Sequence, residues 1–464
     1  MSIRSLSVCL MLLLVVATPF GAASGAESAV GDADQSPSRN MASEDVASPE
    51  DPEEEWERYM PTPLNQRALA REYISSRKGS VHPALSVRYS YTDNLFQEPE
   101  KEKDTVLIIT PTLRLAYPVI GSESLQVASR SIAPGGLEMS RLTPALNLQY
   151  QAFLQYQANI LRHHDFTDQD TDRHNLQGRI NLASNGGLKL ELVDVYDMNN
   201  EPYNSGVDNE LDEYKSNLVS AQLVFDPKKK IWVRLNYNRF DISYDDRRNE
   251  FRDRGDNQFA GYLYFRVRPK TSLFFEFDYL EIDYDEQEVN NAKQYHYLAG
   301  IEWDVTTKTT GLFKLGYGQR NPEESGVDTQ EDLLLEGQID YLYSPKTSFY
   351  LRGTRKYNET DLDLAGYRLT NNAQFGINYK LARKVTTTCD LYYLNDKYLG
   401  TKVTADGKTE QRDDDLWGAS LSLGWHPRRW VTLSVGVSYG ERDSNFSSFD
   451  YEEKSAYIDI SLVF

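Results

Sequence analysis

The sequence predicts an all-β protein: a transmembrane, antiparallel, up-and-down β-barrel of about eighteen strands, with sixteen as the alternative count. Three observations predict this fold. The N-terminus has the pattern of a secretory signal, apolar and polar side chains alternate between regularly spaced turns from Pro83 onward, and the chain ends in an amphipathic strand at Phe464. Barrel strands alternate a lipid-facing and a lumen-facing side chain. A mean hydropathy of −0.59 is therefore compatible with a membrane protein.

Residues 1–26 are predicted to be a cleaved signal peptide. Arg4 supplies the positive charge, residues 6–16 form the apolar stretch, and Ser24-Gly25-Ala26 has the small-x-small pattern of a cleavage site. The apolar stretch is too short for a membrane helix, which needs about twenty residues. We therefore expect a secreted protein.

Residues 27–82 are predicted to be a disordered acidic leader. The whole chain has a net charge of −20, and the segment 27–60 is rich in Asp and Glu and nearly free of large apolar side chains. Such a segment cannot bury enough apolar surface to fold. Within it, residues 64–74 are expected to form a short helix or, equally, a partly ordered linker. The acidic charge also argues against nucleic acid as a partner.

Residues 83–464 are predicted to be the barrel, because short turns and longer polar loops alternate along them. Proline presets the first φ angle of a turn and needs no hydrogen-bond acceptor for its nitrogen. With an even number of strands, both ends of the barrel lie on one side, so the short turns face the periplasm and the loops face outward. Four turns combine Pro with Lys or Arg: Asp226-Pro227-Lys228-Lys229, Arg268-Pro269-Lys270-Thr271, Ser344-Pro345-Lys346-Thr347 and His426-Pro427-Arg428-Arg429.

Charged side chains in the middle of strands predict a water-filled lumen. Arg234, for example, lies between Val233 and Leu235 in an alternating strand. Such a charge is tolerated only on a wet face. A soluble β-sandwich would instead need a dry core between its sheets. The predicted lumen-lining residues are Arg114, Arg234, Arg266, Arg268, Glu276, Glu302, Glu336, Arg352, Lys380, Tyr262, Tyr264 and Tyr350.

The last strand is predicted to close the barrel against the strand at 85–91. Ile458, Ile460, Leu462 and Phe464 share one face, which we expect to meet lipid. This strand is also the predicted signal for the outer-membrane barrel assembly machinery. The chain has 31 Tyr and six Trp, residues that suit a membrane interface. We therefore predict the outer membrane as location, with its lipid and lipopolysaccharide as surroundings.

The beginning of the predicted barrel resembles a known family. Residues 89–96 (Tyr-Ser-Tyr-Thr-Asp-Asn-Leu-Phe) end a strand, and an apolar strand with a central Thr110-Pro111 follows. This start resembles the outer-membrane beta-barrel porins of the second type, which include proteins encoded with exopolysaccharide export systems. The resemblance implies a channel and brings no catalytic residues. From the residues themselves, we expect Asp93 and Asn94 to cap the strand end.

Acidic and histidine side chains that cluster at 163–174 raise the question of a metal site. A calcium loop needs a glycine at its sharp turn and a bidentate glutamate at its end, and this segment has neither. We predict no metal or cofactor, and an acidic loop that attracts divalent cations loosely. No Ser–His–acid spacing identifies a catalytic group, so no enzyme is predicted. The clustered residues are His163, His164, Asp165, Asp168, Asp170, Asp172 and His174.

Two functions remain open. The first is a porin-like channel for passive or export-linked passage of hydrophilic solutes, with exopolysaccharide as the sharper hypothesis and polysaccharide export components as partners. The second is a non-conducting structural or adhesive barrel whose lumen the leader plugs. The lumen itself also allows two interpretations, because charges and aromatic rings suit sugars but also brace a water-filled wall.

Overall fold

The computed structural model describes most of the chain from residue 79 onward. The predicted signal peptide, the leader up to residue 78 and the helix at 64–74 lie outside the described residues. The described ranges are 79–120, 126–132, 138–143, 149–201, 211–286, 290–306, 308–324, 328–359, 367–400, 402–428 and 430–464.

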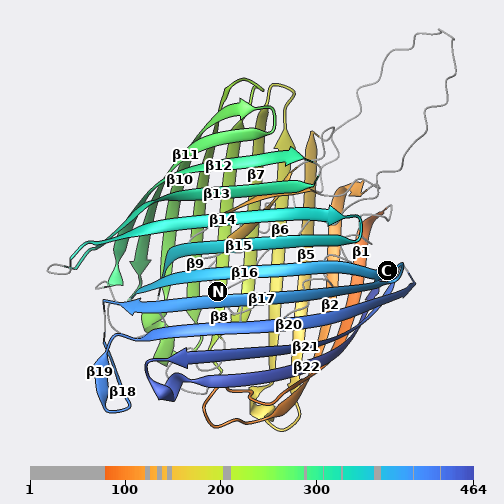
Figure 1. The fold of residues 1–464 in the computed structure, drawn as a ribbon, viewed down its shortest axis with the longest axis vertical. Helices are drawn as coiled ribbons and strands as arrows, with labels where there is room; N and C mark the ends of the chain where they lie inside the picture. The colour runs from red at the N-terminus through yellow and green to blue at the C-terminus, as the bar shows by residue number, and fades with distance from the viewer. Residues whose placement is uncertain are drawn as a thin grey trace. The chain divides into compact units, whose positions relative to one another are not determined.

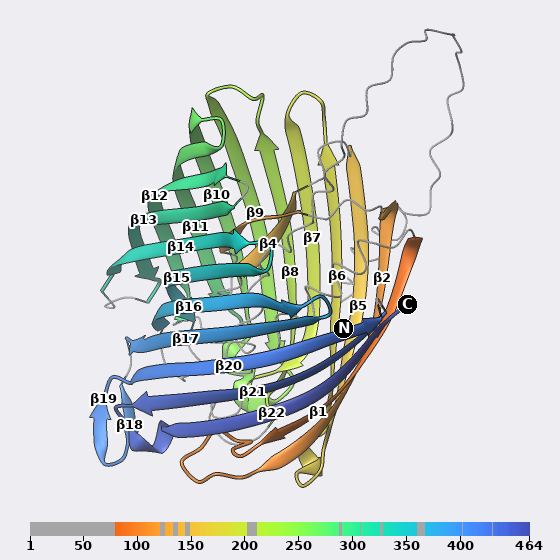
Figure 2. The same ribbon diagram turned by 45° about the vertical axis from the view of Figure 1, so that its right-hand side comes forward.

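Eighteen strands form one antiparallel sheet that closes on itself, which confirms the predicted fold and strand count (Figures 1 and 2). Each strand pairs with the next along the chain, and the first pairs with the last. The strands are β1 (Gly79–Thr92), β2 (Asp104–Ile120), β5 (Tyr150–His163), β6 (Thr171–Ala183), β7 (Leu188–Asn200), β8 (Glu213–Phe225), β9 (Ile231–Tyr244), β10 (Arg254–Arg268), β11 (Thr271–Tyr284), β12 (Ala292–Thr306), β13 (Thr309–Pro322), β14 (Gln330–Ser344), β15 (Thr347–Glu359), β16 (Tyr367–Ala382), β17 (Val385–Leu399), β20 (Asp413–Arg428), β21 (Val431–Ser444) and β22 (Tyr451–Val463).

The closing seam joins β1 to β22, as the sequence predicts. The pairing runs from Ala84 opposite Val463 to Thr92 opposite Ser455. The Phe464 N–H adds a hydrogen bond of 2.8 Å to the Pro83 carbonyl. Strand β1 begins at Gly79, four residues before the predicted start of the barrel.

The connections divide the barrel into two ends, which we call the turn end and the loop end. At the turn end, the four predicted Pro turns join β8–β9, β10–β11, β14–β15 and β20–β21. In the last of them the pairing reaches Arg428 opposite Val431, so His426 and Pro427 belong to the strand. The loop end carries the longer connections with short elements: η3 (Thr167–Gln169), η4 (Arg247–Arg252), η6 (Ser447–Phe449), β18 (Val403–Ala405) and β19 (Lys408–Glu410).

The connection between β2 and β5 adds no strand to the barrel. It contains β3 (Gln126–Ile132) and β4 (Glu138–Thr143), which pair with each other as a separate two-stranded sheet. Strands β2 and β5 on either side pair directly. The connection is therefore an insertion at the turn end.

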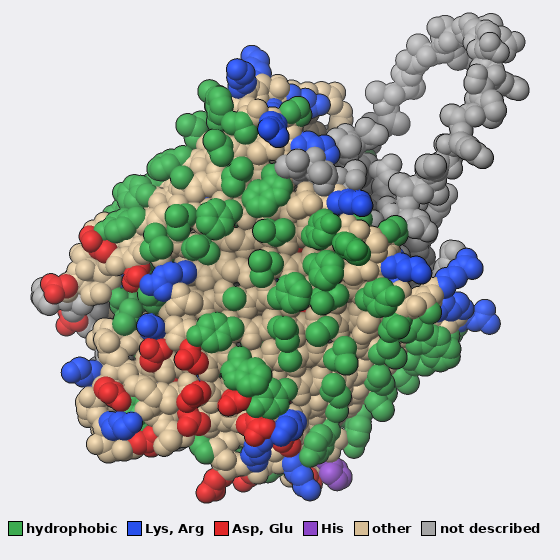
Figure 3. Space-filling model, in the orientation of Figure 1, with side chains coloured by type: hydrophobic (Ala, Val, Ile, Leu, Met, Phe, Trp, Pro, Cys, Tyr) green, Lys and Arg blue, Asp and Glu red, His purple; other side chains and the backbone are tan. Residues whose placement is uncertain are grey.

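The outer face of the sheet is apolar. In β9, Ile231 and Leu235 are each 55% exposed, while Arg234 between them is 8% exposed. Residues that face each other across a pair share a side, so this alternation extends around the sheet. Hydrophobic side chains cover the strands in Figure 3, with acidic side chains concentrated near the loop end. Among the described residues, no helix is long and apolar enough to cross a membrane.

Exposed aromatic residues form two rows on the outer face, one near the turn end and one between the middle of the strands and the loop end. Tyr and Trp prefer this position because their rings have an apolar body and a polar edge. The turn-end row includes Tyr117, Tyr150, Phe225, Phe265, Tyr341, Tyr379, Trp425 and Phe464. The loop-end row includes Tyr89, Tyr156, Tyr237, Phe259, Tyr297, Tyr317, Tyr393 and Trp417.

Candidate functional site in the lumen

The inner face of β9 to β15 carries a connected network of charges and rings, which we call the charged arc. The Arg234 guanidinium lies 3.6 Å from the centre of the Tyr262 ring. The Tyr262 hydroxyl donates to Glu276 at 2.9 Å. Lys314 Nζ lies 2.9 Å from both Glu276 Oε1 and Glu336 Oε2. Because all five side chains are buried, each charge depends on its partner to offset the loss of hydration.

The charged arc extends on both sides of this centre. Trp232 stacks on Tyr264 with ring centres 3.5 Å apart. On the other side, the Arg352 guanidinium lies 4.6 Å from the Tyr350 ring centre. The Tyr350 hydroxyl donates to Asp390 of β17 at 2.6 Å. Charged and aromatic side chains in contact with one another therefore occur along the wall from β9 to β17.

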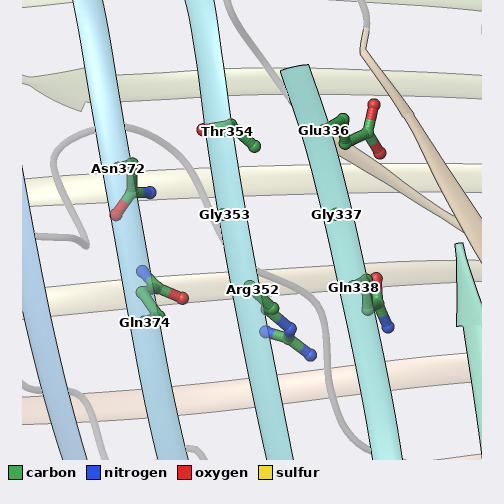
Figure 4. A pocket seen from close by; sticks show the side chains of 8 residues that line it. All are labelled: Glu336, Gly337, Gln338, Arg352, Gly353, Thr354, Asn372 and Gln374. Carbon is green, nitrogen blue, oxygen red and sulfur yellow. The ribbon is translucent and has the colours of Figure 1, made fainter. Parts of the chain in front are cut away.

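A small hollow opens in the charged arc where β14, β15 and β16 lie side by side. Its lining combines one carboxylate, one guanidinium and three amides, so it offers both donors and acceptors. Figure 4 shows the Arg352 side chain extending towards β14. The polar side chains that line the hollow are Glu336, Gln338, Arg352, Thr354, Asn372 and Gln374.

Much of the remaining wall has a different inner face, which we call the hydroxyl–amide arc. It covers β20 to β22, β1, β2, β5 and β6, where small hydroxyl and amide side chains predominate. Charges are fewer there, and those at the closing seam pair, as with Arg88 Nε 3.7 Å from Asp459. Members of this arc, placed inward by the strand register, are Ser420, Ser438, Ser455, Ser86, Ser90, Thr110, Thr112, Gln155, Gln157, Asn175 and Gln177.

Three inward tyrosines lie flat against the wall because a glycine on the adjacent strand leaves room for the ring. A Cβ atom would lie 2.1 Å from the Tyr350 ring at Gly376, 2.4 Å from the Tyr392 ring at Gly418 and 2.2 Å from the Tyr457 ring at Gly436. The Tyr392 and Tyr457 side chains are half-buried, whereas Tyr350 is only 5% exposed and has the Arg352 guanidinium over its ring. The pairs are Tyr350 on Gly376, Tyr392 on Gly418 and Tyr457 on Gly436.

The structure brings seven of the twelve predicted lumen residues into the charged arc as buried members of the network. They are Arg234, Tyr262, Tyr264, Glu276, Glu336, Tyr350 and Arg352. Two more lie on the inner face away from that network centre. Arg114 donates to Gln155 at 2.5 and 2.9 Å, and Glu302 is half-buried on β12.

The other three predicted lumen residues lie at the turn end. Arg266 donates to the Asp226 carboxylate at 2.7 Å and to the Lys229 carbonyl at 2.8 Å. Arg268 and Lys380 are exposed. These cations therefore lie at the mouth of the barrel, since their strands end within two residues of them.

Sequence reasoning missed two members of the network, Lys314 and Asp390. Lys314 lies between Phe313 and Leu315, both about 40% exposed, so the period-two alternation does carry the signal. Asp390 follows Cys389, which faces outward. The glycines opposite the tyrosines carried no such signal, because the pairing register that brings them together is not visible in the sequence.

The predicted strand cap at the family-like start is confirmed by its hydrogen bonds. The Asp93 carboxylate accepts the Lys454 N–H at 2.6 Å. Asn94 is fully buried and donates to the carbonyls of Glu98 and Glu452 at 2.7 and 3.1 Å. These bonds tie the first loop to β22 at the closing seam.

The acidic and histidine cluster is divided by the structure. His163 Nδ1 lies 2.8 Å from Asp104 on the inner side. Arg162 pairs with Asp172 at 2.8 Å, and His174 contacts the Tyr156 hydroxyl at 2.9 Å, both on the outer side. Within the described part of the chain, no three His, Cys, Asp or Glu side chains converge on one point.

A closed sheet with an apolar outer face, two aromatic rows and a polar interior defines a transmembrane β-barrel. The family model described as "Putative beta-barrel porin 2" matches residues 145–464. The chain therefore belongs to this porin family and is a porin-like outer-membrane channel. Porins of this kind are channels rather than enzymes. The family model matches from residue 145 onward. The resemblance noted in the sequence concerns the earlier residues 89–115.

Solved outer-membrane proteins are similar to the chain at low identity. Pseudomonas aeruginosa OpdK with vanillate matches with a TM-score of 0.42 and 10% identity, over 83% of this chain and 99% of that one. Pseudomonas aeruginosa OccK2 (OpdF) gives 0.43 and 10%, over 84% and 99%. Acinetobacter baumannii OccAB4 gives 0.41 and 9%, over 84% and 99%. Likeness at this level says nothing about a substrate. Among curated proteins, no sequence matches the chain.

Proposed function

We propose that the barrel passes hydrophilic, sugar-like solutes through its lumen, with exopolysaccharide as the export-linked substrate. The observation that carries this proposal is the pair of flat, half-buried inward tyrosines, Tyr392 and Tyr457. Ring faces stack on the apolar faces of sugar rings, and the neighbouring carboxylates and amides accept or donate to hydroxyl groups. The mechanism is diffusion through a wet lumen of eighteen strands.

Planar-bilayer conductance tests the sugar hypothesis. Maltooligosaccharides or dextran fragments should block the current of the purified barrel, and Tyr392→Ala or Tyr457→Ala should weaken that block about twofold to tenfold, because an aromatic contact is worth about 0.5–1.5 kcal/mol. The matched control is Tyr317→Ala, which removes an exposed ring on the outer face. Equal block in all four proteins would contradict the sugar hypothesis.

Export of a polysaccharide requires a cellular test. A strain that lacks this chain should secrete less exopolysaccharide, and wild-type protein should restore secretion. The Tyr392→Ala protein should restore it less well than Tyr317→Ala at equal barrel abundance. Unchanged secretion in the deletion strain would contradict the export role and the proposed export partners. Passage of other solutes through the channel would be unaffected by that result.

The alternative function is a non-conducting structural or adhesive barrel. The charged loop end supports it, since side chains there are mostly acidic or paired, as with Lys293 and Glu323. This alternative predicts no current from the full-length protein, so current from the full-length protein excludes it. Silence even after residues 27–80 are deleted would instead exclude the channel.

We infer that the chain has no enzymatic role. His296 lies 3.6 Å from Asp278 and contacts Gln294. His426 contacts the hydroxyls of Thr386 and Thr432 at 3.3 and 3.1 Å. Each of these histidines is bonded to neighbouring strand side chains, which is a wall-bracing role. Hydrolysis of ester or peptide substrates by the purified barrel would contradict this inference.

We also propose that the outer-membrane assembly machinery recognises the last strand through its outward row, Ile458, Ile460, Leu462 and Phe464. Phe464→Ala should lower the amount of folded barrel in the membrane. Phe225→Ala is the matched control, because the two side chains have almost equal exposure, 48% and 47%, in the same aromatic row. Equal losses for both variants would show that the loss reflects a missing aromatic ring at the membrane interface and not a missing recognition signal in the last strand.

A further inference from the structure

The barrel wall is interrupted between β14 and β15. Their pairing stops at Leu335 opposite Arg355, although β14 continues to Gln330 and β15 continues to Glu359. Strand β15 remains paired with β16 as far as Glu359 opposite Tyr367. The loop end of the β15–β16 hairpin therefore leaves the wall as a unit. We call residues 355–359 and 367–369 the infolded end.

The infolded end lies inside the barrel. The Tyr357 hydroxyl donates to the Gly318 carbonyl of β13 at 3.1 Å. A Cβ atom on Gly318 would point into the lumen and would lie 3.0 Å from the Tyr357 ring. Glu359 accepts two hydrogen bonds from Arg320 of β13, at 2.5 and 3.0 Å, and one from the Tyr284 hydroxyl of β11 at 2.8 Å. These contacts reach across three strands of the inner wall.

Apolar packing holds the infolded end in this place. Tyr357, Tyr367 and Leu369 form one buried cluster with Leu298 of β12 and Leu334 of β14. Burial of these large apolar side chains removes them from water and so stabilises the infolded position. The infolded end thus occupies part of the lumen cross-section and narrows the path at the loop end.

The alternation of side chains along β15 would also allow its loop end to lie in the barrel wall, paired with β14. Its outward residues are Phe349, Leu351, Gly353 and Arg355, and Tyr357 is next in this alternation. If the register with β14 continued, Tyr357 would lie opposite Leu333, beside Tyr317 of the outer aromatic row. In the infolded position Arg355 instead fills the seam, donating to the Leu333 carbonyl at 3.0 Å and to Asp332 at 2.8 Å.

We propose that the infolded end sets the size limit of the pore and moves between two positions: latched inside by the Arg320–Glu359 pair, and paired with β14 in the wall. The latch favours the inside position. The wall position gains strand pairing but brings Glu359 opposite Glu331, and like charges directly opposite each other are unfavourable. Arg320 and Glu359 are therefore residues that determine which solutes pass. The proposal needs a conducting barrel but no particular solute.

Disulfide trapping tests the wall position directly and does not depend on conduction. In a chain with Cys9→Ala and Cys389→Ala, the pair Leu333→Cys and Tyr357→Cys should cross-link in outer membranes under oxidation. Adding Glu359→Gln should increase the cross-linked fraction. The matched control is Gly337→Cys with Gly353→Cys, an outward pair whose residues are already directly opposite. If the control cross-links and the test pair does not in either background, the wall position does not exist.

Conductance then tests the size limit. Glu359→Gln should raise the unitary conductance and admit larger oligosaccharides, because the latch loses its charge pairing. The control is Glu323→Gln, which removes a similar pair with Lys293 on the outer surface and should leave conductance unchanged. Oxidising the Leu333→Cys, Tyr357→Cys channel should raise conductance, and reduction should reverse it. Equal conductance of the Glu359→Gln and wild-type channels would overturn the proposal.

Discussion

The two arcs of the lumen wall have the same backbone and the same outer face but different inner faces. The charged arc, β9 to β15, holds Lys314 between two carboxylates and Arg234 over a tyrosine ring. The hydroxyl–amide arc, β20 through β1 to β6, presents mainly serine, threonine, asparagine and glutamine. One lipid-facing pattern therefore supports two inner surfaces.

This difference shows how freely the inner face can vary. A barrel requires outward apolar residues and paired strands, and both arcs meet this requirement. Inward side chains must only be hydrated or paired. In the charged arc, each charge depends on a partner, so the network is stiff and sensitive to single changes. In the other arc, hydrogen bonds are local, as between Ser438 and Ser455, so single changes should be tolerated.

The largest difference between the arcs is expected from the loss of Lys314. Lys314→Met leaves Glu276 and Glu336 buried without their shared cation, and breaking a buried ion pair costs about 3–5 kcal/mol. On the other arc, Ser90→Ala should change the free energy of unfolding by less than about 0.5 kcal/mol. Urea unfolding of the refolded barrel in detergent measures both.

Replacing all three charges separates the ion network from packing. The triple variant Lys314→Met, Glu276→Gln, Glu336→Gln should recover much of the lost stability, because no uncompensated charge remains. If Lys314→Met and Ser90→Ala change the free energy of unfolding equally, the charged arc is no more sensitive to single changes than the hydroxyl–amide arc.

The sequence predicts the barrel well because its signals are local. Alternation in strands such as Ile231–Leu235, proline in the short turns and the terminal Phe464 each depend on a few neighbouring residues. The closing pair of β1 and β22 follows from these signals, because a barrel has no free edge. The same alternation places Arg234, Tyr262 and Glu336 inside.

What the sequence could not predict depends on register and on departures from the alternation. The fit of Tyr350 over Gly376 needs the pairing of β15 with β16. Tyr357 has the spacing of an outward residue, yet it lies inside, because the hairpin end leaves the wall. Arg266 alternates inward but lies at the turn end, where Asp226 binds it. Position along the barrel axis therefore needed the structure.

A smaller effect is expected where rings lie on glycines. Gly376→Ala places a methyl group 2.1 Å from the Tyr350 ring, and such overpacking costs about 1–3 kcal/mol. Gly436→Ala should do the same to Tyr457 on the other arc, where the nearest ring atom is 2.2 Å away. Thermal unfolding with intrinsic tyrosine fluorescence measures both variants.

Gly353→Ala is the control for this effect, because the nearest atom to its Cβ is a carbonyl oxygen 3.7 Å away. It should stabilise the barrel by about 0.5–1 kcal/mol, since glycine is unfavourable within a strand. Destabilisation by Gly353→Ala as large as that by Gly376→Ala would show that the glycines are needed for backbone reasons and not for the rings.

The smallest effect is expected in the loops above the two arcs, where two aspartates respond to pH in opposite directions. Above the charged arc, burial raises the pKa of Asp212, which accepts from Arg248 and Asn249. Above β20 and β21, the Ser448 N–H and the Ser447 hydroxyl donate to Asp406 at 3.1 Å each and lower its pKa. The ordinary pKa of both is 3.8.

The stability of the two loops should therefore change in opposite directions on acidification. A raised pKa means that the folded loop around Asp212 binds the proton more tightly than the unfolded chain does. The folded loop therefore becomes more stable as pH falls through the raised pKa towards 3.8. A lowered pKa means that the Asp406 contacts are fully stable above pH 3.8 and are lost as pH falls through the lowered value. Hydrogen exchange of the Ser448 amide, corrected for its intrinsic rate, should increase only at the acid end. Asp406→Asn keeps an acceptor oxygen but removes the charge, so it should flatten this dependence, and an unchanged pH profile in that variant would assign the response to another group.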